Sequence, residues 1–161
     1  MKVTIREDSG LVTRPLDAAR DRHWSTGGTY TLVLSVPDRT TVEVGALGEV
    51  RFEPGGYAYT GSALGAGGFS RVDRHRRIAA GEHDVRHWHV DYLTGHPGTT
   101  LRTVLLAPGR DAECAVATAV GEGPVDGFGA SDCGCDSHLA REPSVQAVSE
   151  QVRAAYDRLG G

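Results

Sequence analysis

Short β-rich segments crowd the chain between residues 28 and 60, and the breaks between them leave no room for helical crossovers. Residues 29–36 alternate and are β-branched, which predicts a strand. A Pro-Asp-Arg turn follows, and residues 41–44 are expected to pair back on that strand as a hairpin. Residues 49–53 and 57–60 predict two further strands. Strands with such short connections are antiparallel neighbours, so the sequence predicts a small central antiparallel sheet.

The remaining segments predict helices that flank this sheet. Residues 69–80 have a helical pattern that Gly81 ends, and residues 144–159 repeat apolar side chains on one helix face. The other expected elements are a helix at 15–23, a strand at 101–107, a helix at 111–120 and a segment at 87–93 that suits either a strand or a helix. The predicted fold class is therefore α/β of the α+β type, with an N-terminal extension (1–27), a main domain (28–140) and a C-terminal helix packed on it (141–161).

Length and composition bound the class of protein. The 161 residues suit one domain with a real core, and no apolar run approaches the roughly 18–20 residues of a membrane span. The N-terminus lacks the apolar core of a signal peptide. Three cysteines, an odd number, favour thiols or metal ligands over a disulfide framework. We therefore expect a cytoplasmic protein that has no membrane partner.

The charge is unevenly distributed. A net charge of −4 argues against a protein that coats nucleic acid without specificity. Residues 71–89, however, hold five arginines against three acidic residues, together with four histidines. This segment carries a charge of +2 and leaves −6 for the rest of the chain. The pattern predicts a small basic patch on an acidic body.

Four side chains near this patch have the chemistry of a phosphodiester site: Tyr30, Tyr59, Arg71 and His75. A tyrosine can share its proton, an arginine binds phosphate oxygens as a fork, and a histidine exchanges protons near neutral pH. Arg71 and His75 are four residues apart and so share one helix face. The same residues are also typical of ordinary strand aromatics and of a solvated basic helix face.

Gly28-Thr29-Tyr30 and Tyr59-Thr60-Gly61, followed by Arg71 and His75, resemble the pattern of the GIY-YIG nuclease superfamily. The resemblance implies cleavage of nucleic acid, of DNA rather than RNA. It implies that Tyr30 helps to activate water, that Tyr59 orients the phosphate and that Arg71 contacts the scissile phosphate. His75 matches a histidine of some members, and His83 matches a further histidine of the homing enzymes.

The same resemblance implies a single Mg²⁺ or Mn²⁺ ion, held by a glutamate on a helix after the last strand of the sheet. Glu113 has that place in the predicted order of elements. One carboxylate with waters is a usual way to hold a hard cation near phosphate. Alternatively, Glu113 is an ordinary acidic residue in the first turn of a helix, where the helix dipole favours negative charge. Asp111 would serve that purpose equally well.

Two further motifs resemble one uncharacterised archaeal and bacterial branch of that superfamily, known only as a domain of unknown function. They are the HWHVDYL run at 87–93 and the SDCGCDSHL run at 131–139, which accompany residues 56–63 and the Glu113-Cys114 pair. This resemblance covers residues 28–139. Candidate substrate-binding residues here are Arg74, His83, His87 and His89. We expect Trp88 and Tyr92 to lie in the core.

Cys133, Cys135 and His138, with Cys114 or a carboxylate, have the ligand types of a zinc site. Their C-x-C-x-x-H spacing differs from the usual knuckle, and a tight glycine-kinked loop with small buried thiols explains it slightly better. A third interpretation puts His138 or Asp132 at the edge of the active site.

Our leading hypothesis is a metal-dependent nucleic-acid phosphodiesterase. The alternatives are a non-catalytic nucleic-acid-binding module and a zinc-stabilised scaffold that retains the fold.

Overall fold

The computed structural model describes residues 1–121, 125, 128 and 137–160. Its strands are β1 Lys2–Glu7, β2 Gly10–Pro15, β3 Gly28–Val36, β4 Thr40–Glu43, β5 Glu49–Phe52, β6 Gly55–Ala63, β7 Thr100–Pro108 and β8 Leu139–Glu142. Its α-helices are α1 Leu16–His23, α2 Ser70–Ala79, α3 His89–Thr94, α4 Glu113–Val120 and α5 Val145–Asp157. Short 3-10 turns occupy Gly45–Leu47 and Arg158–Gly160. The predicted strands and helices are thus present to within a few residues.

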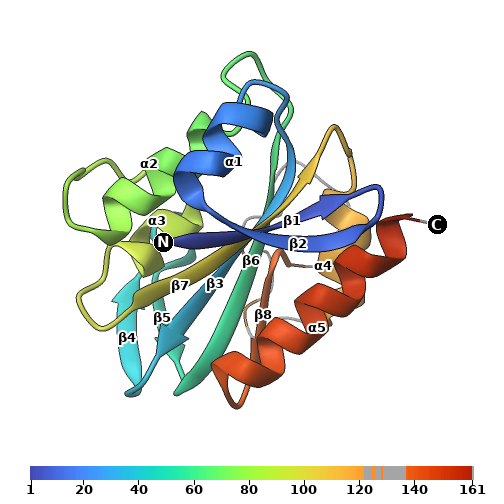
Figure 1. Cartoon of the computed structure of the whole chain (residues 1–161). Helices are drawn as coiled ribbons and strands as arrows, with labels where there is room; N and C mark the ends of the chain where they lie inside the picture. Colours follow the sequence, from blue (N-terminus) through green and yellow to red (C-terminus); the bar gives the residue numbers. More distant parts are fainter. Residues whose placement is uncertain (122–124, 126–127, 129–136, 161) are drawn as a thin grey trace.

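One twisted sheet organises the molecule (Figure 1). Its strand order is β2-β1-β7-β3-β6-β8, and β4 and β5 form a separate two-stranded sheet. Every pairing in the main sheet is antiparallel except that of β1 with β7. The predicted α+β fold, a central antiparallel sheet flanked by helices, is therefore confirmed.

The expectation that residues 41–44 pair back on the preceding strand is wrong. β4 pairs with β5 instead, from Thr40 opposite Phe52 to Glu43 opposite Glu49. The reason is that β3 has two long neighbours, β6 along its whole length on one side and β7 on the other. With both of its edges occupied, β3 has no free backbone groups to offer β4.

The first 27 residues form β1, β2 and α1. β1 lies inside the main sheet between β2 and β7, and its Val3 and Ile5 are completely buried. These side chains join the same core cluster as Tyr30 and Leu32 of β3. The N-terminal residues therefore supply strands to the same sheet that carries the two tripeptides.

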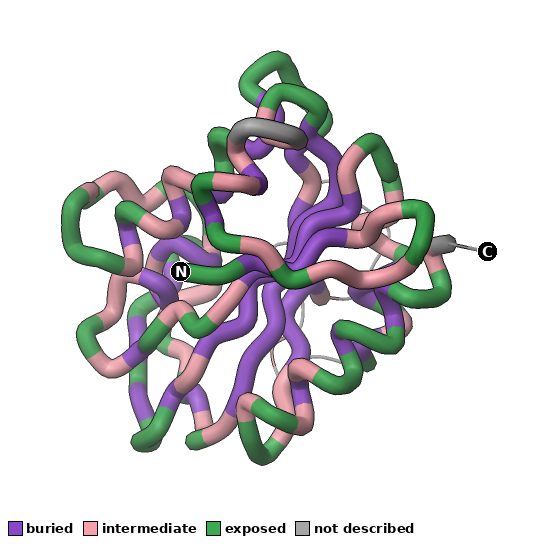
Figure 2. The backbone as a smooth tube through the Cα atoms, viewed as in Figure 1, coloured by how far each residue is buried: buried purple, intermediate pink, exposed green. Residues whose placement is uncertain are grey.

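Helices cover both faces of the sheet, and its central strands β3 and β6 are buried over most of their length (Figures 1 and 2). Tyr30, Leu32 and Leu34 of β3 pack in one cluster with residues of α1, α2 and α3. Val33, between them, points to the opposite face and packs with residues of α4 and α5. The alternation of β3 thus separates a face under α2 and α3, which carries Tyr30, from a face under α4 and α5.

α5 begins where the sequence predicts. The Ser144 side chain accepts a hydrogen bond from the Ala147 backbone N–H at 3.1 Å, which caps the helix. Val148, Val152 and Tyr156 are buried against the sheet. Within the described residues, none of the helices has the length and apolar character that crossing a membrane requires.

Candidate functional site

The floor of the site is made by two tyrosines on neighbouring strands. Tyr30 on β3 and Tyr59 on β6 belong to the same buried cluster on the α2 side of the sheet. Gly61 lies directly opposite Tyr30 in the β3–β6 register. A Cβ at Gly61 would lie 2.5 Å from the Tyr30 hydroxyl oxygen, so only glycine leaves room for the phenol. The second tripeptide thus shapes the place of the first tyrosine.

His75 on α2 stands over this floor and is completely buried. Its Nε2 lies 2.7 Å from the Tyr30 hydroxyl, and its ring centroid lies 6.2 Å from that of Tyr59. Burial lowers the pKa of His75 well below its ordinary value, although the carboxylate of Asp91 opposes this effect. The imidazole is therefore neutral at physiological pH.

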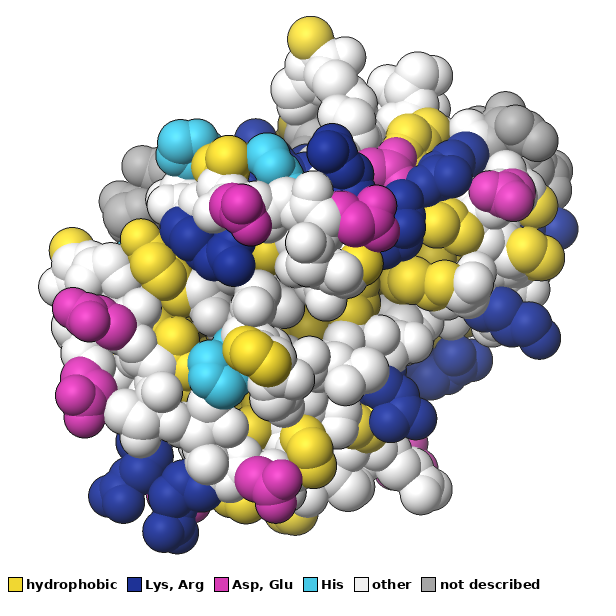
Figure 3. Space-filling view, turned by 90° about the vertical axis from the view of Figure 1, so that its left-hand side faces the viewer, with side chains coloured by type: hydrophobic (Ala, Val, Ile, Leu, Met, Phe, Trp, Pro, Cys, Tyr) yellow, Lys and Arg dark blue, Asp and Glu magenta, His cyan; other side chains and the backbone are white. Residues whose placement is uncertain are grey.

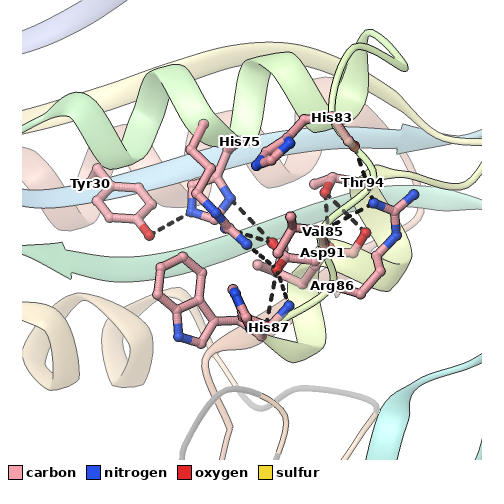
Figure 4. Close-up of polar contacts among 11 residues, drawn as sticks. Tyr30, His75, His83, Val85, Arg86, His87, Asp91 and Thr94 are labelled. Carbon is pink, nitrogen blue, oxygen red and sulfur yellow. Dashed lines mark hydrogen bonds and ion pairs between the residues drawn. The ribbon is translucent and has the colours of Figure 1, made fainter.

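Asp91, on α3, faces the other nitrogen of the imidazole (Figure 4). Its Oδ1 lies 3.9 Å from Nδ1 of His75, which makes no hydrogen bond with any described residue. A carboxylate beside Nδ1 favours the tautomer that carries its proton there. Nε2 then accepts the hydrogen bond from the Tyr30 hydroxyl. The arrangement is a series of three buried groups, Tyr30, His75 and Asp91.

Asp91 itself is held by four donors. The Arg74 guanidinium binds both carboxylate oxygens, at 3.0 and 2.7 Å, and the backbone N–H groups of His87 and Trp88 donate to Oδ2 at 2.8 and 3.0 Å. Burial by itself raises the pKa of Asp91, but these hydrogen bonds outweigh burial and lower it. Asp91 therefore stays ionised next to His75.

Arg71 lies one helical turn before His75 and is exposed. It donates to the Ser62 backbone carbonyl at 2.5 Å, and its guanidinium lies 4.7 Å from the centre of the Trp88 ring. It forms no ion pair with any residue that the structure describes. Its charge remains available for an anion, in contrast to that of Arg74.

Glu113, in the first turn of α4, lies near enough for its charge to raise the pKa of both tyrosines. Burial raises the pKa of Tyr30 and of Tyr59, the Glu113 and Asp91 carboxylates raise both further, and Arg71 lowers both. The structure therefore brings together Tyr30, Tyr59, Arg71, His75 and Glu113.

Glu113 also lies 3.6 Å from Nδ1 of His138, measured from its Oε2. Burial lowers the pKa of His138, so this imidazole too favours its neutral form. Among the described residues, no group of three or more His, Cys, Asp or Glu side chains is placed to share a metal ion. A single carboxylate beside an arginine and two phenols nevertheless suits a hard cation that keeps most of its waters and shares a phosphate.

The three histidines predicted to bind substrate lie around the Tyr30–His75–Asp91 group, and their role stays a prediction. The imidazole of His83 makes no hydrogen bond or ion pair with a described residue, although its carbonyl accepts from Arg86 at 3.3 Å. His87 is exposed and contributes its backbone N–H to Asp91. The His89 ring packs edge-on against Phe128 at 5.5 Å.

Trp88 departs from the expected core position. Its side chain is 36% exposed, and it packs on Arg71, Arg74 and His75 rather than in either core cluster. Tyr92 is half-buried and packs against the larger cluster. The alternating segment that contains both residues becomes helix α3 because Asp91 accepts the N–H groups at the start of the helix.

Cys114 departs from the expected free thiol, because it is disulfide-bonded. Cys133 and Cys135, like Asp132, lie outside the described residues. The zinc site predicted at Cys133, Cys135 and His138 stays a prediction. The disulfide follows from tertiary proximity, which a count of cysteines does not reveal.

Sequence reasoning missed Asp91. It stands between Val90 and Tyr92 in a largely apolar run, and an acidic residue at such a position is seldom buried without a partner. An acidic residue within an apolar run therefore predicts a buried ion pair. The identity of the partner, Arg74, depends on how α2 and α3 pack.

Together, the fold and the site define a mixed α/β protein that holds a buried tyrosine, histidine and aspartate beside one exposed arginine. Residues 29–161 match the family described as Domain of unknown function DUF123. The chain belongs to that family, and the match includes the C-terminal helix beyond residue 139. No curated protein and no solved structure matches the chain.

Proposed function

We propose that this protein is a metal-dependent nucleic-acid phosphodiesterase of the GIY-YIG type. The observation that carries the proposal is the exposed guanidinium of Arg71, which lies beside the Tyr30–His75 pair and has no ion-pair partner among the described residues. An uncompensated arginine next to a proton-sharing phenol suits a phosphate and a water that attacks it. The GTY and YTG tripeptides with Arg71 in the expected order add support.

In this proposal Arg71 binds the scissile phosphate and stabilises the charge that builds up on it. The Tyr30 oxygen accepts a hydrogen bond from the attacking water and orients it, while the Tyr30 hydroxyl donates to Nε2 of the neutral His75 imidazole. The proton of the water leaves to solvent. Asp91 faces Nδ1 of His75 and fixes its tautomer. Tyr59 orients the phosphate from the adjacent strand. His75 and Asp91 act through Tyr30 and are positioning residues.

Glu113 would hold the Mg²⁺ or Mn²⁺ ion. When bound, such a cation neutralises charge on the phosphate and lowers the pKa of a bound water. His138, 3.6 Å from Glu113, would orient the carboxylate as an outer partner.

The proposed substrate is DNA, bound at a local site rather than along a broad basic surface. The face in Figure 3 supports a local site, since its arginine and lysine side chains lie among acidic and histidine side chains.

The test incubates the purified full chain with Mg²⁺ or Mn²⁺ and a panel of labelled single-stranded, duplex, branched and flapped DNA and RNA. Arg71→Ala and Glu113→Gln each test one role, and Arg77→Ala, an exposed arginine on the same helix, is the matched control. We expect cation-dependent cleavage that both site variants reduce at least 100-fold and the control leaves nearly unchanged. Binding without cleavage by the wild type would favour the non-catalytic binding module instead.

A further inference from the structure

Trp88 lies at the edge of the site in an unusual environment for such a large apolar side chain. Two guanidinium groups lie over its ring, that of Arg74 at 4.2 Å and that of Arg71 at 4.7 Å from the ring centre. The ring centre of His75 lies 6.0 Å from that of Trp88. All three partners belong to α2. The indole packs in neither core cluster and is buried only against these α2 side chains, which leaves 36% of Trp88 exposed.

The exposed part of the indole lines a pocket of about 410 Å³. The other lining residues are Arg71, Arg74 and a small-residue wall formed by Ala63, Gly65, Ala66, Gly67, Gly68 and Ser70. The pocket therefore has an aromatic side, two guanidinium groups and no carboxylate. Its volume falls within the range of small-molecule sites.

A flat aromatic surface next to cations matches the two parts of a nucleotide, a planar base and a phosphate. Bases stack on tryptophan whatever their identity, because each base presents a π face. The small side chains that line the rest of the pocket leave its volume open beside the indole. Arg71 contacts the indole and also borders the proposed phosphate position, so base and phosphate would be neighbours on one strand.

We propose that Trp88 is a stacking surface for an unpaired nucleobase, and that the substrate of this site is single-stranded or carries an unpaired nucleotide next to the scissile phosphate. This inference rests on the proposed function, because it assigns a substrate class to the same site. A base within a duplex has both faces covered by its neighbours, so it offers no face to the indole. An unpaired base has one.

The test measures binding of labelled 12-nucleotide DNA strands to the full chain in EDTA, which removes divalent cations so that no cleavage occurs. The probes are a single strand, a blunt duplex of the same sequence and a strand of equal length without bases. The variants are Trp88→Phe, which keeps an aromatic face, and Trp88→Leu, which keeps apolar bulk only. Leu64→Ala is the matched control, since Leu64 is exposed nearby but does not line the pocket.

We expect the wild type to bind the single strand at least tenfold more tightly than the duplex and the strand without bases. Trp88→Leu should lose about tenfold for the single strand and almost nothing for the strand without bases, whereas Trp88→Phe and Leu64→Ala should stay close to the wild type. Thermal melts of each variant confirm that it is folded. Equal single-strand affinity of a folded Trp88→Leu variant and the wild type would overturn the inference.

The two proposals fail in different ways. Base-dependent binding that needs Trp88, without cleavage when Mg²⁺ or Mn²⁺ is added, would refute the phosphodiesterase and leave the stacking surface. Cation-dependent cleavage that needs Arg71 and Glu113, with no role of Trp88 in strand preference, would refute the stacking surface alone.

Discussion

The Tyr30 hydroxyl lies 2.7 Å from Nε2 of His75, and both side chains are buried between α2 and the sheet. The two residues are 45 positions apart, yet they form the central polar contact of the site. Because the imidazole is neutral and Asp91 faces its other nitrogen, the phenol donates and the imidazole accepts. His75 is therefore the hydrogen-bond acceptor that fixes the direction of the Tyr30 hydroxyl.

Replacement of His75 by Phe is expected to change the pH dependence of stability. Burial lowers the pKa of His75 from 6.5 to about 3, so below pH 6.5 the unfolded chain binds a proton that the folded chain does not. Stability of the wild type should therefore fall as the pH drops from 6.5 toward 3, by up to about 1.4 kcal/mol per pH unit. Urea titrations between pH 7.5 and 4.5 should show a smaller slope for His75→Phe. Equal slopes would contradict a neutral buried His75.

Asp91→Asn should destabilise the protein strongly. The change removes the charge that faces Arg74 and leaves its guanidinium, which is largely buried, without a carboxylate. Breaking such a pair costs about 3 kcal/mol or more. The free energy of unfolding in urea measures the effect. Asp17→Asn, which alters an exposed pair with Arg20, is the control and should change little. Similar losses in the two variants would argue against a special role for the Asp91 contacts.

Gly61→Ala should displace the Tyr30 phenol. The new Cβ would meet the hydroxyl oxygen at 2.5 Å and the carbon that bears it at 2.6 Å, so the ring must move away from His75. We expect a loss of about 1–3 kcal/mol in stability and a loss of any cleavage activity. Gly65→Ala, where a Cβ meets nothing within 4 Å, is the matched control for the thermal melt. A Gly61→Ala variant as stable as the control would show that the phenol has room to spare.

Thr31→Val tests whether stability and activity can be separated. The Thr31 hydroxyl bonds to Thr60 and to Tyr156, both at 2.9 Å, on the sheet face opposite His75. Removal of this hydroxyl leaves buried polar groups with fewer partners and should cost about 1–2 kcal/mol. Well below the melting temperature, single-strand binding should stay unchanged. A parallel loss of binding would mean that the two faces of the sheet are coupled.

Cys114 should not react as a free thiol in oxidised protein, because it is disulfide-bonded. Alkylation in denaturant followed by peptide mapping should leave Cys114 unmodified before reduction and modified after it. Complete alkylation of Cys114 in protein purified without reductant would exclude the disulfide.

Much of the architecture follows from local pattern. The β-branched alternation of β3, the capped amphipathic repeat of α5 and the glycine stop after α2 each have a local physical cause, so the sequence predicts them well. The segment at 87–93 was ambiguous because seven alternating residues are too few to distinguish the two periods, and only the Asp91 hydrogen bonds decide for helix α3. The partner of β4 depends on competition among strands for the edges of β3, which no local pattern encodes.

The features of the site, like those of the fold, are partly set by local sequence and partly by tertiary packing. The sequence by itself determined the chemical types at the tripeptides, the helical spacing of Arg71 and His75, and the place of Glu113 at the start of a helix. Only the tertiary structure decided that Asp91 faces His75 and that Trp88 lies at the surface. It also decided that Arg74 forms an ion pair with Asp91, whereas Arg71 has no ion-pair partner among the described residues. The physical reason is that hydrogen bonds and burial belong to pairs of residues. The packing of α2 on α3, and not the identity of either residue, brings those pairs together.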